Sequence, residues 1–118
     1  MNPKVRSIVK FLNANWHRQI RMAEITALVG LARSRVDDLF KAEFGRSPLQ
    51  YLRELRLEKA RVLLETTTLR IKQVRLAVGY QGHRHFFQDW FRYRARVYDT
   101  HGASVGRWAW DVFFVALQ

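Results

Sequence analysis

The chain has 118 residues, of which 48% are hydrophobic and 14% aromatic, a composition that supports a packed core and disfavours disorder. Its 21 lysines and arginines against 10 acidic residues give a net charge of +11, which indicates a polyanionic partner, nucleic acid before an anionic membrane. It has no cysteine, which excludes disulfides and thiolate metal sites, and no apolar run long enough for a signal peptide or a membrane span.

The first predicted element is an amphipathic helix near the amino terminus. Apolar residues recur there at helical spacing, at Val5, Ile8, Val9, Leu12 and Trp16. This spacing predicts a helix with one buried face.

Two segments about fifty residues apart are similar to each other. Residues 20–31, "IRMAEITALVGL", align without gaps with residues 69–80, "LRIKQVRLAVGY". Apolar positions match throughout, and both segments close with Val-Gly followed by a large apolar residue. Such self-similarity indicates a duplicated supersecondary unit.

Each copy has the pattern of a helix-turn-helix. Gly30 and Gly79 follow a helical run at the place where a left-handed residue ends a helix, and glycine adopts that conformation without a Cβ clash. The next residue, Tyr80 in the second copy, is expected to fold back into the core. A second helix follows, whose first apolar anchor lies six residues after the glycine in copy one (Val36) and seven in copy two (Phe86). The second turn is therefore predicted to be one residue longer.

The segment between the copies predicts a long helix over about residues 47–65. Ser47 can cap it, Pro48 suits its first position, and Gln50 completes a capping box. Its apolar residues spread around more than one stripe, so we expect a rigid connector buried between two bodies.

Two stretches carry a resemblance to a known family: "ALVGLARSRVDDLFKAEFGRSPLQYLRELRLEKARVLL" (27–64) and "IKQVRLAVGYQGHRHFFQDWFR" (71–92). Over roughly residues 5–92 the chain resembles the DNA-binding domain of the AraC/XylS family of bacterial transcription regulators. The resemblance implies an all-α, homeodomain-like fold of about seven helices, in which two helix-turn-helix subdomains are joined by the connector helix. The expected first unit covers about residues 5–46, the second about 69–95, and an atypical tail about 96–118.

The resemblance also implies a function. We expect sequence-specific binding of double-stranded DNA and transcription regulation, by activation, with the two recognition helices in successive major grooves. The spacing agrees, since grooves on one face of DNA recur every ~34 Å and a helix of some eighteen residues spans ~27 Å. The chain is similar to short stand-alone MarA-like members, which act as monomers on DNA, or to a fragment of a longer regulator. RNA polymerase is a further expected partner, the expected location is the bacterial cytoplasm, and no cofactor, metal or catalytic activity is expected.

Base-reading residues are expected in the first turns of each second helix, because these turns face the base edges in helix-turn-helix docking. Arginine can bond guanine, glutamine adenine, and aspartate cytosine. In copy one these residues are Arg33, Ser34, Asp37 and Asp38, with Arg35 and Lys41 nearby, and in copy two they are Gly82, His83, Arg84, Phe87 and Gln88. Surrounding arginines and lysines and the backbone N–H groups at helix N-termini are expected to contact phosphates.

Two of these positions have alternative interpretations. Asp38 could read a base, or it could form an intramolecular ion pair with Arg35 or Lys41. Phe87 could face DNA, or it could pack inward, since a small or polar residue is usual there in the family.

Three arginines depart from the family pattern. Arg75 stands where the family almost always has alanine, so it is expected either to extend to solvent or to separate the packed helices. Arg21 and Arg70 stand where serine or threonine would cap a helix, and each lost cap costs ~1 kcal/mol.

The sequence after Phe91 lacks the second Phe-Gly and Thr/Ser-Pro that both the family pattern and the repeat predict. The tail has Trp110, Phe113, Phe114 and Leu117 at helical spacing, so it could serve as a docking helix or as an interaction segment, or it could be a frameshifted reading frame. An interaction segment would suit an alternative function, a non-enzymatic adaptor in which DNA binding is lost or non-specific.

A metalloenzyme built on the histidines is disfavoured. His83 and His85 are two residues apart, so they point in different directions on a helix, and zinc needs three or four ligands. The pair of His85 and Asp89 at i,i+4 is a common feature of helix surfaces.

Overall fold

The computed structural model describes residues 1–101, with side chains through Arg96. These residues form six helices and no strand. The chain divides into two compact units, Met1–Leu55 (unit 1) and Arg56–Gln118 (unit 2), and the division falls inside the fourth helix. The expected segment with Trp110, Phe113, Phe114 and Leu117 lies outside the described residues.

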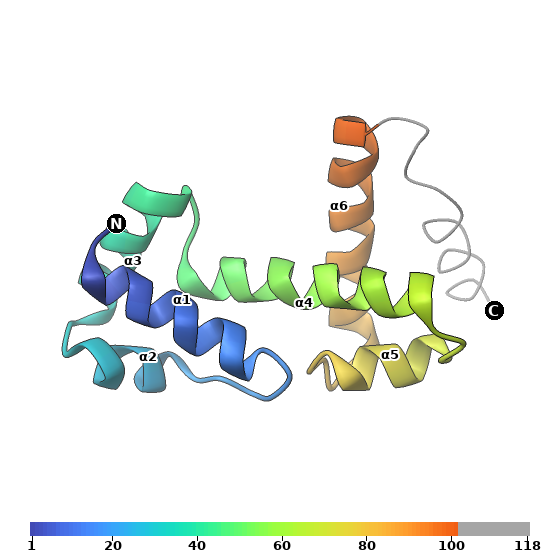
Figure 1. The fold of residues 1–118 in the computed structure, drawn as a ribbon, viewed down its shortest axis with the longest axis horizontal. Helices are drawn as coiled ribbons and strands as arrows, with labels where there is room; N and C mark the ends of the chain where they lie inside the picture. Colours follow the sequence, from blue (N-terminus) through green and yellow to red (C-terminus); the bar gives the residue numbers. More distant parts are fainter. Residues whose placement is uncertain (102–118) are drawn as a thin grey trace. The chain divides into compact units, whose positions relative to one another are not determined.

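Unit 1 contains α1 (Pro3–Asn15), α2 (Met22–Val29), α3 (Arg33–Phe44) and the beginning of α4 (Pro48–Thr66) (Figure 1). Helix α1 packs against α2 and α3, and α2 packs against α3. The core residues come from all four helices and are Val5, Ile8, Leu12, Ile25, Val29, Val36, Phe40 and Leu52. The predicted amphipathic face of the first helix is thus the buried one.

The start of α4 has the capping arrangement expected from the sequence. The Ser47 backbone N–H donates to Gln50 Oε1 at 2.9 Å, and the Gln50 N–H donates to Ser47 Oγ at 3.3 Å. Pro48 occupies the first helical position, where its missing N–H costs nothing. The helix then continues for 19 residues without an interruption.

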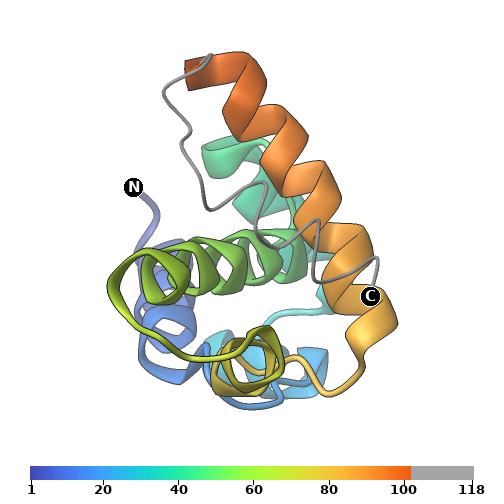
Figure 2. The same cartoon turned by 90° about the vertical axis from the view of Figure 1, so that its right-hand side faces the viewer.

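Unit 2 contains the rest of α4, then α5 (Ile71–Ala77) and α6 (His83–His101) (Figures 1 and 2). Helix α5 packs against α6. The buried hydrophobic residues of this unit are Leu57, Ala60, Val74, Val78, Tyr80, Phe86, Trp90 and Tyr93. Aromatic rings therefore fill much of a core that is mostly aliphatic in unit 1.

Helix α6 is longer than α3, its counterpart in unit 1. Helix α3 has 12 residues and ends at Phe44, followed by Gly45 with a φ of 71°, whereas α6 has 19 residues and continues past residue 95, near which the second unit was expected to end. Between His83 and His101 the sequence contains neither glycine nor proline, so nothing in it ends the helix where the repeat would.

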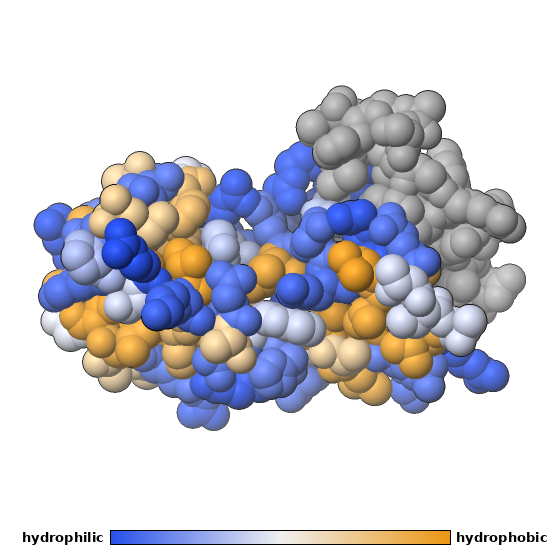
Figure 3. Space-filling view, viewed as in Figure 1, coloured by the Kyte–Doolittle hydropathy of each residue, from blue (hydrophilic) through white to orange (hydrophobic). Residues whose placement is uncertain are grey.

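Hydrophilic residues predominate on the face drawn in Figure 3, with apolar residues in small patches between them. In the described part of the chain, no helix is long and apolar enough to span a bilayer.

Candidate nucleic-acid interface

The first helix-turn-helix is formed by α2, a short turn and α3. Gly30 has a φ of 67°, and its N–H donates to the Thr26 carbonyl at 2.8 Å, which closes the end of α2 as predicted. Three residues after Gly30, α3 begins at Arg33. The turn therefore directs the first residues of α3 outward from the core.

The predicted base-reading residues of unit 1 lie on the solvent side of α3. Val36 and Phe40, one turn apart, are buried at 1% and 0% exposure and fix which face of α3 is inside. Asp37 is half-buried, and the exposed residues are Arg33, Ser34, Arg35, Asp38 and Lys41. The structure thus gives these side chains the access that base contacts require.

Asp38 forms no ion pair with Arg35 or Lys41 in the described part of the chain. The ion pairs recorded in unit 1 join Arg18 to Glu24 and Arg46 to Glu54. Base reading by Asp38 therefore stays a prediction, while its intramolecular alternative finds no support here.

The N-termini of α2 and α5 keep half of a capping box despite their arginines. The Arg21 N–H donates to Glu24 Oε2 at 2.8 Å, and the Arg70 N–H donates to Gln73 Oε1 at 2.8 Å. A guanidinium group cannot accept a hydrogen bond, so the half of the box that a serine or threonine side chain would supply is absent.

The second helix-turn-helix is formed by α5, a longer turn and α6. Gly79 has a φ of 94°, and α6 begins four residues later at His83, so the turn is one residue longer than in unit 1, as predicted. Tyr80 is 7% exposed and packs its ring on Phe86 with centroids 5.2 Å apart. This residue anchors the turn in the core.

The predicted base-reading residues of unit 2 surround the start of α6. Gly82, His83, Arg84 and Gln88 are exposed. Phe87 is half-buried between two other rings, with centroids 5.5 Å from Phe86 and 6.3 Å from Phe91. Its ring therefore belongs partly to the aromatic packing of α6.

A groove of about 380 Å³ lies between α5 and the start of α6. Its lining combines apolar and basic side chains, namely Ile71, Lys72, Arg75, His83 and Phe87. This lining suits an anionic group such as a phosphate, because Lys72 is exposed and the backbone N–H groups at the start of α6, which begins at His83, attract anions.

Arg75 contradicts both alternatives expected for it. Its side chain neither extends to solvent nor separates the helices: the residue is 9% exposed, and Nη1 donates to the Tyr80 carbonyl at 3.0 Å and to the Gln81 carbonyl. Two carbonyl oxygens of the turn satisfy the guanidinium where alanine would leave them without this donor.

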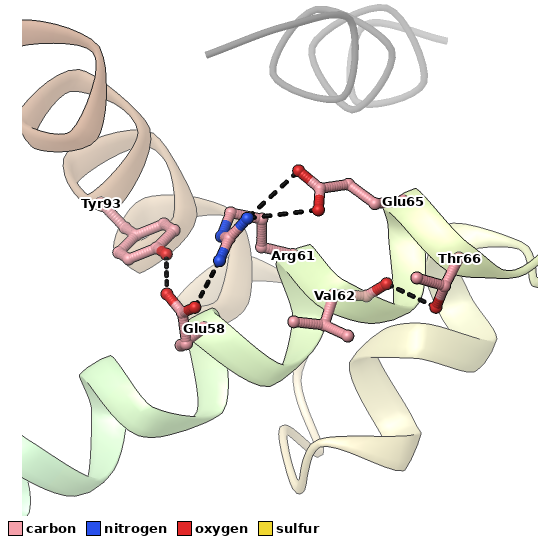
Figure 4. Close-up of polar contacts among 6 residues, drawn as sticks. All are labelled: Glu58, Arg61, Val62, Glu65, Thr66 and Tyr93. Carbon is pink, nitrogen blue, oxygen red and sulfur yellow. Dashed lines mark hydrogen bonds and ion pairs between the residues drawn. The ribbon is translucent and has the colours of Figure 1, made fainter. Parts of the chain in front are cut away.

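The hydroxyl of Tyr93 on α6 connects this helix to α4 within unit 2. It donates to Glu58 Oε2 at 2.5 Å, while Arg61 pairs with the other oxygen of Glu58 and with Glu65 (Figure 4). Burial and the hydrogen bond to Glu58 raise the pKa of Tyr93 to about 12. The contact holds α6 against α4 at a point well beyond its recognition turns.

The histidines form no metal site in the described residues. His83 and His85 are both exposed, and no group of three His, Cys, Asp or Glu side chains there is arranged to hold a metal ion. Asp89 accepts its hydrogen bond from the Tyr80 hydroxyl at 2.8 Å.

Comparison with known proteins decides the family. A family model described as a helix-turn-helix domain matches residues 25–98, which include both turns. A solved AraC-type DNA-binding domain regulator from Chromobacterium violaceum is 34% identical and superposes with a TM-score of 0.69, covering 76% of this chain and 80% of that one. The chain belongs to the AraC/XylS family.

Curated AraC/XylS relatives are regulators of transcription. The HTH-type transcriptional regulator ArgR of Pseudomonas aeruginosa is 34% identical over 85 residues, which are 72% of this chain and 26% of the relative. The lactose operon transcription activator of Staphylococcus xylosus is 32% identical over 81 residues, 69% of this chain and 29% of the relative. The chain spans about a quarter of the length of these relatives, the part that in this family binds double-stranded DNA.

Sequence reasoning did not predict the roles of three residues at the candidate site of unit 2. Lys72 lines the groove, Asp89 holds the hydroxyl of Tyr80, and Arg75 binds the turn. The signal for Lys72 was its position one helical turn before Arg75 in a basic helix. Asp89 and Arg75 act through contacts that no spacing rule predicts.

Proposed function

We propose that this chain binds double-stranded DNA with sequence preference through the first turns of α3 and α6, and thereby regulates transcription in the bacterial cytoplasm. The observation that carries the proposal is the exposure of polar and basic side chains at the start of both helices, behind which Val36 and Phe86 are buried. A net charge of +11 supplies the general attraction to phosphates.

The contacts divide into two kinds by chemistry. Arg84 and Gln88 of α6, and Arg33 of α3, can form hydrogen bonds with base edges in the major groove. Lys41 and Lys72 carry compact charges that suit phosphates, as does the backbone at the start of α6. Gly82, which precedes α6, allows the DNA backbone to approach closely because it has no side chain.

The direction of regulation is proposed to be activation, by contact with RNA polymerase, and the chain is proposed to bind as a monomer without cofactor or chemistry of its own. A Staphylococcus relative is a transcription activator, which supports the direction. Two different recognition helices in one chain support the monomer, because such a chain can read two unlike boxes without a symmetric partner.

Random-site selection with the purified chain tests this function. We expect an enriched site with two boxes about one helical turn of DNA apart, bound in gel shifts with a log-log salt slope equivalent to several phosphates. A single box would assign reading to one unit and contradict the two-groove part of the proposal. Equal affinity for the selected site and for random duplex at every salt concentration would contradict sequence preference altogether.

A further inference from the structure

A buried arginine near the second turn requires a structural reason. Arg75 is 9% exposed in the last turn of α5, and a charge at this depth is costly unless polar partners replace its water. Its partners are main-chain carbonyls of the turn, so hydrogen bonds to the backbone offset this cost.

Arg75 binds the turn through both its side chain, which donates, and its main-chain carbonyl, which accepts. The side-chain Nη1 donates to the carbonyls of Tyr80 and Gln81, and the Tyr80 N–H donates to the Arg75 carbonyl at 3.1 Å. These carbonyls stand one and two residues before Gly82, whose own carbonyl accepts from Phe86 in the first turn of α6. Arg75 therefore holds the segment from which α6 starts.

The first turn of the chain is built without such a side chain. Thr26 aligns with Arg75, and its hydroxyl donates to Ala23 within its own helix at 3.1 Å. Among the side chains of residues 1–96, none is recorded as donating to the carbonyl of Leu31, the turn residue that follows Gly30. The second turn has one residue, and so one carbonyl, more than the first, and Arg75 binds the carbonyls of Tyr80 and Gln81 in it.

We propose that Arg75 is a positioning residue for the second recognition helix: by fixing the Tyr80–Gln81 carbonyls it sets the direction in which His83 and Arg84 are presented to DNA. This inference rests on the proposed DNA-binding function. It assigns to Arg75 a role that depends on Nη1, because the N–H groups of this one nitrogen, held in the plane of the guanidinium, donate to both carbonyls.

The test compares R75M, R75K and the charge-matched control R53A by site selection and gel shift. Methionine fills a similar volume without donors. Lysine keeps the charge but carries its donors on a flexible stem in place of a fixed plane, and Arg53 is an exposed residue of α4 in unit 1. We call the DNA box bound by α3 the α3 box and the one bound by α6 the α6 box. For R75M we expect unchanged base preference in the α3 box and loss of base preference in the α6 box. We also expect a tenfold to hundredfold weaker affinity for the two-box site, which corresponds to roughly one to two lost hydrogen bonds of a charged donor. R75K should recover part of the α6 preference, and R53A should lower affinity equally for all sequences.

Three results separate failure of this inference from failure of the proposed function. A wild-type chain that selects no box for α6 would contradict the two-groove part of the proposed function, on which this inference rests. An R75M variant that keeps the wild-type preference in both boxes, or that weakens all sequences only as R53A does, would overturn the role of Arg75 while the function stands. If R75M does not fold, hydrogen exchange in the wild-type chain decides, since bound guanidinium protons of Arg75 should exchange far more slowly than those of Arg53, and equal rates would overturn the proposal.

Discussion

The hydroxyl of Tyr80 donates a hydrogen bond of 2.8 Å to Asp89 Oδ2, which joins the second turn to the interior of α6. The matching residue of the first turn, Leu31, can contribute only apolar contact. The two turns therefore share a backbone plan and differ in the forces that hold them.

Replacing Tyr80 with phenylalanine should lower the free energy of unfolding by about 1 kcal/mol, because the ring keeps its packing and one hydrogen bond to a half-buried carboxylate is lost. Urea denaturation followed by circular dichroism measures the change. The matched control is Tyr51→Phe, whose ring contacts Phe40 and Phe44 and which should change stability less. Equal effects of the two substitutions would contradict the role given to the Tyr80 hydroxyl.

Replacing Gly30 with alanine should destabilise the chain by about 1–2 kcal/mol, since a left-handed residue with a Cβ is strained even though nothing lies within 4 Å of the added carbon. Gly30→Asn should cost less, because asparagine tolerates this conformation better than alanine. Thermal unfolding of the two variants side by side checks the order. If alanine proved as stable as glycine, the left-handed end of α2 would be the wrong explanation.

The roles proposed for Arg84 and Lys41 predict different losses. Arg84→Ala should relax base preference in one half of the selected site and cost about 1–3 kcal/mol on that site. Lys41→Ala should weaken every sequence alike and reduce the salt slope by about one charge. Gel shifts on the selected and randomised sites at several salt concentrations distinguish the two, and a uniform loss for both variants would remove Arg84 from base reading.

Tyr93 should titrate unusually late. Burial first, and then the bond to Glu58, raise its pKa from 10.0 to about 12, so the folded state favours the neutral phenol. Its contribution to stability is therefore complete below pH 10 and is lost as the pH rises toward 12. Tyrosinate absorbance, with Tyr93→Phe as the reference for the other tyrosines, measures this transition.

The same titration tests the contact across unit 2. Glu58→Gln should lower the pKa of Tyr93. The substitution removes the carboxylate that repels the tyrosinate and accepts a hydrogen bond from the phenol, while Arg61, which favours the tyrosinate, remains. Glu65→Gln is the control, since Glu65 contacts Arg61 but has no recorded bond to Tyr93 in the described residues. A shift of equal size in both variants would mean that the net charge of the region, and not the contact, sets this pKa.

Much of the fold follows from the spacing of apolar residues and from the capping and turn residues in the sequence. The capping box at Ser47 and Gln50 and the left-handed glycines at positions 30 and 79 are decided by residues within a few positions of each other. Local chemistry of this kind is readable without knowing what packs against it.

The remainder depended on contacts between distant parts of the chain. Tyr93 and Glu58 are 35 residues apart and meet because α4 and α6 pack together in unit 2. Arg75 seemed misplaced because its partners are backbone carbonyls, which every residue carries and which no sequence pattern displays. The second unit was expected to end near residue 95, whereas α6 continues to His101, and the sequence between His83 and His101 holds no glycine or proline to end it.

The unbroken course of α6 also couples its two ends mechanically. Nineteen residues at about 1.5 Å each make a rod of roughly 28 Å, and a rod without a hinge rotates as a whole. Because α6 has no hinge along its described length, any change in the direction of its carboxyl end also changes the direction in which its first residues, His83 and Arg84, are presented.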